Sequence, residues 1–224
     1  MTKIFVATGF VLTLSLSAFS IFAQTQSRED ILKNIEAKRA ELAALEQRFL
    51  SPSEEDQARY AEFLNQPETG LIRLLPREKY DTATYKENKK SITIRGGGAY
   101  YSFARLTHEY GYGSDIELAK GTLSTGFAGG QSGSFVNLGD IPLETVSLET
   151  PAAQRLASNG TTRNKSQSRV PLKLNSTYLL RSDDPAGSDV LVVFKVVRID
   201  SDESAIILWK LLKKSPVTQG ARNN

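Results

Sequence analysis

The sequence contains no cysteine and only one histidine, and this scarcity limits its chemistry. Without cysteine there can be no disulfide, thiol nucleophile, iron–sulfur cluster or cysteine-ligated zinc. A zinc site would have to combine His108 with carboxylates alone, which is a weak ligand set for that metal. We therefore predict that the protein holds no cofactor and no metal.

Nucleotide-binding and hydrolase motifs are also missing. The three glycines at 96–98 do not continue to the third glycine of G-x-G-x-x-G, and no G-x-x-x-x-G-K-[ST] occurs. The nearest approach to a G-x-S-x-G nucleophile elbow, at 130–134, lacks the final glycine. A Ser-His-Asp triad would need His108 as its base, so His108 is a weak catalytic candidate. The sequence leaves enzymatic activity open but favours a protein that is not an enzyme.

The excess of one charge is small, with a formal net charge of +3. Acidic residues outnumber basic ones from 24 to 68, and the reverse holds from 69 to 224. Most of 150–176 is expected to be an exposed loop, and its basic stretch 155–173 could meet an anionic polymer or lipid headgroups outside the cytoplasm. That stretch has no aromatic residue for base stacking, so we predict no nucleic-acid partner.

Only one long hydrophobic run is present, and it lies at the start. After Lys3, the segment 4–23 contains no charge and ends in small residues, which predicts a secretory signal peptide spanning 1–23. The alternative is an uncleaved anchor, because a helix of that length can span a membrane. Either outcome places the body outside the cytoplasm, in the periplasm or the secreted space, and a membrane association is expected only if the run is retained.

Residues 24–68 carry helical patterns and are predicted to form a stalk or hairpin. Segment 27–50 lacks glycine and proline and is rich in good helix formers. Its large apolar residues follow the spacing of about three heptads, interrupted by Lys38: Ile31, Ile35, Leu42, Leu45 and Phe49. A capping box from Ser51 to Glu54 predicts a second helix that ends near Asn65. The helical segment 27–65 either self-associates as a short coiled coil or packs on its own domain.

The chain becomes β-like after a connector at 69–90. Three strands near the end, expected at 177–182, 189–199 and 204–214, are separated by turn-forming residues and predict an antiparallel meander. The central strand is apolar on both faces and needs cover on both sides, which a closed barrel or a two-layer sandwich provides. The predicted fold is therefore α+β, mainly β: a coiled-coil-like stalk, an antiparallel β-barrel or β-sandwich at 91–214, and a flexible tail at 215–224.

The segment 95–115 is rich in glycine and tyrosine and contains the histidine. If it formed a single strand, alternate side chains would share one face. Tyrosine rings stack well on planar or sugar surfaces, although core packing explains the same residues. The ligand-binding candidates are Tyr100, Tyr101, His108, Tyr110 and Tyr112.

Three functional hypotheses follow from these features. The first is an exported, non-enzymatic envelope or secreted protein that assembles through 27–65 and binds a partner through its β domain. The second is a ligand-binding β module, for example for a glycan, that uses the tyrosines. The third and least favoured is a hydrolase that depends on His108.

Overall fold

The computed structural model describes the chain from 27 to 216 with several gaps. The described residues are 27–80, 82–84, 91–93, 98–108, 110–111, 113–127, 132–158, 168–184 and 188–216. The predicted leader at 1–23, Tyr112 and most of the predicted tail lie outside them. Internal contacts divide the chain into one unit that ends at Glu41 and another that begins at Leu42. Among the described residues, no helix combines the length and apolarity that a membrane crossing requires.

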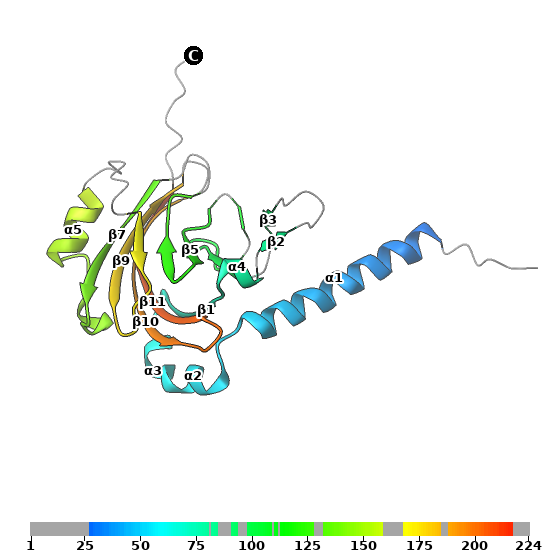
Figure 1. Ribbon diagram of the computed structural model, residues 1–224, viewed down its shortest axis with the longest axis horizontal. Helices are drawn as coiled ribbons and strands as arrows, with labels where there is room; N and C mark the ends of the chain where they lie inside the picture. The colour runs from blue at the N-terminus through cyan, green and yellow to red at the C-terminus, as the bar shows by residue number, and fades with distance from the viewer. Residues whose placement is uncertain are drawn as a thin grey trace, which may run out of the picture. The chain divides into compact units, whose positions relative to one another are not determined.

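Three helices open the described chain: the first agrees with the predicted segment 27–50, and the other two divide the predicted second helix. Helix α1 spans Arg28–Leu50, α2 spans Glu54–Arg59 and α3 spans Ala61–Leu64 (Figure 1). The expected second helix is thus two short helices that meet at Tyr60.

The predicted capping box is wrong by two residues. Ser53, not Ser51, caps α2: the Asp56 amide donates to the Ser53 hydroxyl at 3.1 Å, and the Ser53 amide donates to the Asp56 carboxylate at 3.3 Å. Asp56 also accepts from Arg198 Nη1 at 2.5 Å. Arg198, which is distant in the sequence, therefore helps to hold the N-terminal end of α2 in place.

The larger sheet has five antiparallel strands in the order β1-β11-β10-β9-β7 (Figure 1). Their bounds are Thr69–Leu74 for β1, Ala205–Pro216 for β11, Ser188–Ile199 for β10, Thr177–Asp183 for β9 and Ser132–Gly139 for β7. The meander predicted near the end is confirmed as β9, β10 and β11. The first residues of the expected connector form β1, which pairs with β11 along its whole length and is an edge strand of the sheet.

A smaller antiparallel sheet of four strands packs on one face of the larger one. Its order is β4-β5-β6-β8, with bounds Tyr100–Tyr101, Ile116–Ala119, Thr122–Ser124 and Arg169–Pro171. A short helix α4, Arg77–Tyr80, and a hairpin of β2, Thr82–Thr84, with β3, Ser91–Thr93, lie between β1 and β4 in the chain. One core cluster joins the two larger sheets, with Ile116 and Leu118 of β5 packing among side chains such as Phe194 and Trp209.

Helical segments cover the opposite face of the five-stranded sheet. Helix α5, Pro151–Ser158, and the 3₁₀ turn η1, Leu143–Thr145, pack with Leu191 and Val193 of β10 in a second core cluster. Helix α5 occupies the start of the predicted loop 150–176. Arg181 of β9 holds its C-terminal end, donating from Nη1 to the carbonyls of the last turn at 3.2 Å.

The overall architecture is mixed α/β with two antiparallel sheets, which confirms the coarse fold prediction. Strand β10 is buried on both faces, as its sequence indicates: Val192 and Phe194 face the small sheet, while Leu191 and Val193 face the helices. Both sheet orders begin and end with different strands, so within the described residues neither sheet closes into a barrel.

Candidate functional site

The candidate tyrosines do not share one face, because the segment that carries them is not a single strand. Strand β4 is only two residues long and is followed by a tight turn that a bridge between Ser102 and Thr107 closes. Leu106 occupies the left-handed region in this turn, with φ of 55°. No glycine or asparagine marks the position, so the sequence contains no ordinary signal for the turn.

Tyr100 and Tyr101 are consecutive residues of β4 and therefore point to opposite sides. The Tyr100 ring packs against Tyr110, with ring centroids 4.6 Å apart, and the Tyr101 ring packs against His108 at 4.9 Å. Both tyrosines are buried, at 2% and 6% exposure. The structure thus separates the described candidates into two groups instead of one aromatic platform.

The Tyr100 group lies beside an ion pair in which Glu117 is buried and Arg77 is partly exposed. Arg77 Nη1 lies 2.6 Å from Glu117 Oε1, and the Ser124 hydroxyl donates to the other oxygen of the same carboxylate at 2.7 Å. Burial, followed by the neighbouring Glu117 charge, raises the pKa of Tyr100 to about 12. The phenol is therefore neutral at physiological pH, and this group has the features of a core contact between α4 and the small sheet.

Asp115 anchors the turn that follows β4. Its carboxylate accepts a hydrogen bond from the Phe103 amide at 2.7 Å and one from the Ser102 hydroxyl at 3.4 Å. The side chain is buried, and this burial raises the pKa of Asp115 to about 6. The turn that carries His108 at its end is therefore held against the start of β5.

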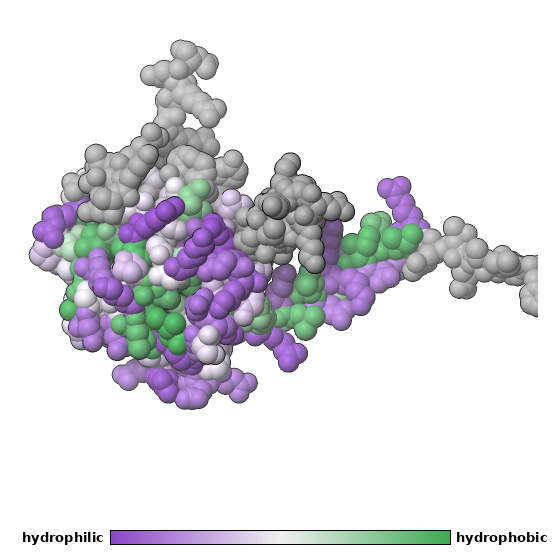
Figure 2. Space-filling view, viewed as in Figure 1, coloured by the Kyte–Doolittle hydropathy of each residue, from purple (hydrophilic) through white to green (hydrophobic). Residues whose placement is uncertain are grey.

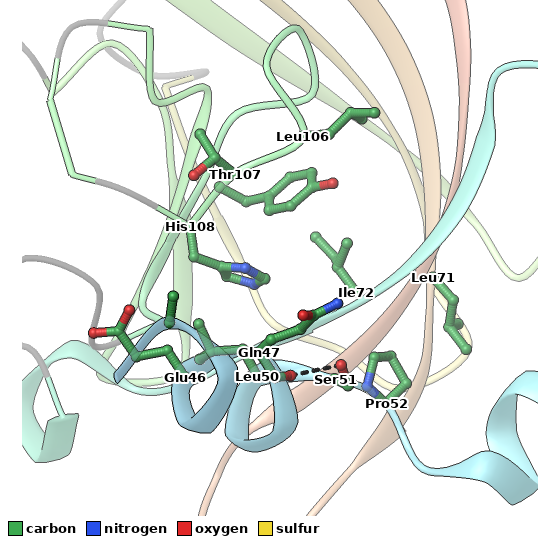
Figure 3. A pocket seen from close by; sticks show the side chains of 12 residues that line it. Glu46, Gln47, Leu50, Ser51, Pro52, Leu71, Ile72, Leu106, Thr107 and His108 are labelled. Carbon is green, nitrogen blue, oxygen red and sulfur yellow. Dashed lines mark hydrogen bonds between the residues drawn. The ribbon is translucent and has the colours of Figure 1, made fainter. Parts of the chain in front are cut away.

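The second group, Tyr101 with His108, lines a pocket of about 350 Å³. One wall is the last part of α1 with Ser51 and Pro52, the floor is β1, and the other wall is the turn after β4 (Figure 3). The lining residues are Ala43, Glu46, Gln47, Leu50, Ser51, Pro52, Leu71, Ile72, Tyr101, Leu106, Thr107 and His108. All of them belong to the unit that begins at Leu42. Sequence reasoning identified only Tyr101 and His108, since nothing in the sequence places α1 beside β1.

His108 uses its ring to bind the backbone of β1. Its Nε2 lies 2.9 Å from the carbonyl oxygen of Arg73, and since a carbonyl only accepts, the ring must donate. Burial lowers the pKa of His108, with the hydrogen bond to Arg73 opposing the shift. The described residues place no serine hydroxyl or carboxylate in hydrogen-bonding contact with this ring, so they assemble no catalytic triad around it.

Carboxylates of the acidic turn between β10 and β11 form ion pairs with arginine side chains. Arg73 Nη2 lies 3.3 Å from Asp202, and Arg198 Nε lies 2.7 Å from Asp200. Across the residues with defined positions, no three His, Asp or Glu side chains are grouped in a way that could hold a metal ion.

Helix α1 carries an exposed row of large apolar residues, here called the apolar stripe. Its members, at the heptad positions, are Ile31, Ile35, Leu42, Leu45 and Phe49, with exposures from 41% at Ile35 to 55% at Leu42. Figure 2 shows hydrophobic and hydrophilic side chains on different sides of this helix. Lys38, which interrupts the stripe, forms an exposed ion pair with Glu41 at 2.7 Å.

Comparisons of the chain with protein-family models, curated proteins and solved structures give no match. Two features of the described residues therefore carry the functional argument: the apolar stripe on α1 and the pocket beside β1.

Proposed function

We propose that this protein is an exported, non-enzymatic protein of the cell envelope or secreted space that assembles with copies of itself through α1. In this proposal α1 is a coiled-coil-like stalk, and the two packed sheets form a sandwich-like domain that carries a partner contact. The apolar stripe supports the first part, and the uncharged segment 4–23 supports export, either as a cleaved leader or as a membrane anchor.

The apolar stripe carries the proposal because its exposure has a free-energy cost in water. Fully burying one large apolar side chain stabilises by about 1.5–3 kcal/mol. Five such side chains at heptad spacing match the seam of a short coiled coil, in which each packs between residues of a partner helix. A second copy of α1 offers the same spacing, so self-association is the simplest way to cover the stripe.

The stripe and the pocket use different sides of α1. At about 100° per residue, Ala43, Gln47 and Leu50 lie roughly a third of a turn away from the stripe. Pairing through the stripe therefore leaves the pocket side of α1 available.

The decisive experiment replaces the centre of the stripe. We expect the double variant Leu42→Lys, Leu45→Lys to elute with the mass of one chain, whereas the unaltered protein has the mass of an oligomer by light scattering. Lysine retains good helix propensity, so the change acts on the seam and not on the helix. The matched control is Ala40→Lys, which lies on the opposite side of α1 and should leave the oligomer intact. A wild-type protein that stays monomeric at high micromolar concentration, or a stripe variant that keeps the oligomer mass, would sink the proposal.

The glycan-binding alternative has less support. Tyr100 and Tyr101 are buried, and their rings pack on neighbouring aromatic residues instead of forming an open stacking surface. The hypothesis of a hydrolase acting through His108 has the least support, because that ring is hydrogen-bonded to a backbone carbonyl.

A further inference from the structure

The pocket lies along the outer edge of β1, and the register shows which backbone groups face it. The Leu211 amide donates to the Glu68 carbonyl at 2.8 Å, so this pair is of the hydrogen-bonded type. Because such pairs alternate along an antiparallel ladder, Gly70 and Ile72 direct their backbone groups at β11, while Leu71 and Arg73 direct theirs outward.

Two other contacts agree with this assignment. The Arg73 carbonyl accepts from His108, and the Leu75 amide donates to the Gly98 carbonyl at 3.0 Å. Both groups belong to odd-numbered residues and both bind partners outside the large sheet. Three outward backbone groups of β1 have no hydrogen-bond partner among the described residues. They are the amide and the carbonyl of Leu71 and the amide of Arg73.

We infer that this slot binds an extended peptide segment of a partner protein, which pairs with Leu71 as an added strand. The inference deepens the proposed function, on which it rests, by locating the partner contact of the β domain. The main chain of an extended peptide can hydrogen-bond with both the amide and the carbonyl of Leu71. This is the usual mode of strand addition at a sheet edge.

The walls of the slot favour a single peptide over a second copy of the sheet. On one side stand Leu50 and Pro52, and on the other stand Leu106 and His108 (Figure 3). A second copy of β1 would bring its own two walls into the same space. His108 also occupies the next acceptor on the edge, so only a short length of strand is open.

The lining also indicates which side chains the peptide carries. Apolar side chains such as Leu50, Ile72 and Leu106 provide a site for one apolar residue. Glu46 is half-buried in the lining and has no ion-pair partner among the described residues, which favours a lysine or arginine near that residue.

The test uses the protein expressed with its own leader and purified in the form that the cell makes. An array of blocked hexapeptides that combine one apolar residue with neighbouring lysine or arginine is screened, and the dissociation constant of the best peptide is measured. Leu71→Pro removes one backbone donor, the outward amide, and also replaces the leucine side chain; proline is permitted on an edge strand, and Gly70 tolerates the restriction before proline. We expect Leu71→Pro to weaken binding about tenfold. The control Leu71→Ala keeps the amide and should change binding by less than about threefold.

A second measurement does not depend on how the variant folds. The same peptide, N-methylated at each backbone position in turn, is titrated into the wild-type protein, and one methylation should abolish binding. The proposal is overturned if no peptide binds at millimolar concentration, if Leu71→Pro binds as well as wild type, or if N-methylation has no effect. It is also overturned if Leu71→Pro lowers the oligomer mass, since the edge would then join two copies. Peptide binding to the Leu42→Lys, Leu45→Lys variant should persist, which separates this inference from the fate of the proposed function.

Discussion

His108 is the only histidine, and therefore the only side chain whose ordinary pKa lies near neutrality. The sequence makes it only a weak catalytic candidate, and in the structure its ring binds a backbone carbonyl. By occupying the Arg73 carbonyl, it joins the turn after β4 to the edge of β1. No sequence pattern indicates such a contact, because the acceptor is a backbone carbonyl group, which every residue possesses.

The lowered pKa of His108 gives a prediction for stability against pH. The unfolded chain binds the proton more readily than the folded chain, so the stabilising effect of neutral His108 is present above the ordinary value of 6.5 and is lost as the pH falls below it. His108→Gln cannot titrate but can still donate to the Arg73 carbonyl. We expect urea unfolding to show that the wild type loses stability relative to this variant as the pH drops from neutral to acidic. Parallel pH profiles for the two proteins would contradict the assignment.

Gly70 has a role in the packing of β1 against β11 that its residue type alone does not indicate. In the sequence it looks like a signal that stops the preceding helix, whereas in the structure it lies opposite Trp209 in the β1–β11 ladder. A Cβ atom at this position would lie 2.5 Å from two carbons of the indole ring. The glycine therefore makes room for the largest side chain of the core.

Gly70→Ala is accordingly expected to destabilise the protein. Inserting a methyl group into a packed contact costs about 1–3 kcal/mol, more than any gain from the better strand propensity of alanine. Chemical denaturation measures the loss, and the same change in a Trp209→Leu background provides the control. If the clash is the cause, the second background reduces the cost; equal costs in both backgrounds would point to the backbone instead.

The elements that could be predicted are those whose own residues dictate them. Strand β10 is recognisable because its residues are apolar on both faces, and α1 because it lacks glycine and proline. The cap of α2 was displaced because two serines, Ser51 and Ser53, each stand three residues before an acidic residue, and the pattern does not say which one caps. Helix α5 was missed, and its C-terminal end is held by a distant arginine, Arg181. The contact of Arg181 with α5 is set by the tertiary fold and leaves no local signal.

At the scale of the whole molecule, the candidate site is an assembly of segments that lie far apart in the sequence. The end of α1, the edge strand β1 and the turn after β4 each provide one side of the pocket. The composition of 95–115 indicated Tyr101 and His108 as candidates, but the sequence does not show that residues 69–74 join a sheet whose other strands begin at Ser132 or later. The positions of the apolar stripe, in contrast, were predictable because heptad spacing is a property of one helix, whereas the sequence left open whether these residues are exposed or packed on the domain.

Because the chain has no cysteine, self-association through α1 can be tested directly by disulfide crosslinking. A single cysteine can be placed on the stripe as Leu42→Cys or Leu45→Cys, and on the opposite side of α1 as Ala40→Cys, with no other thiol to compete. Each protein, and an equal mixture of the first two, is oxidised mildly and examined for disulfide-linked dimers. The account predicts rapid dimer formation through the stripe cysteines, alone or in the mixture, and little through Ala40→Cys. Equal crosslinking at all three positions, or none at any, would contradict self-association through α1.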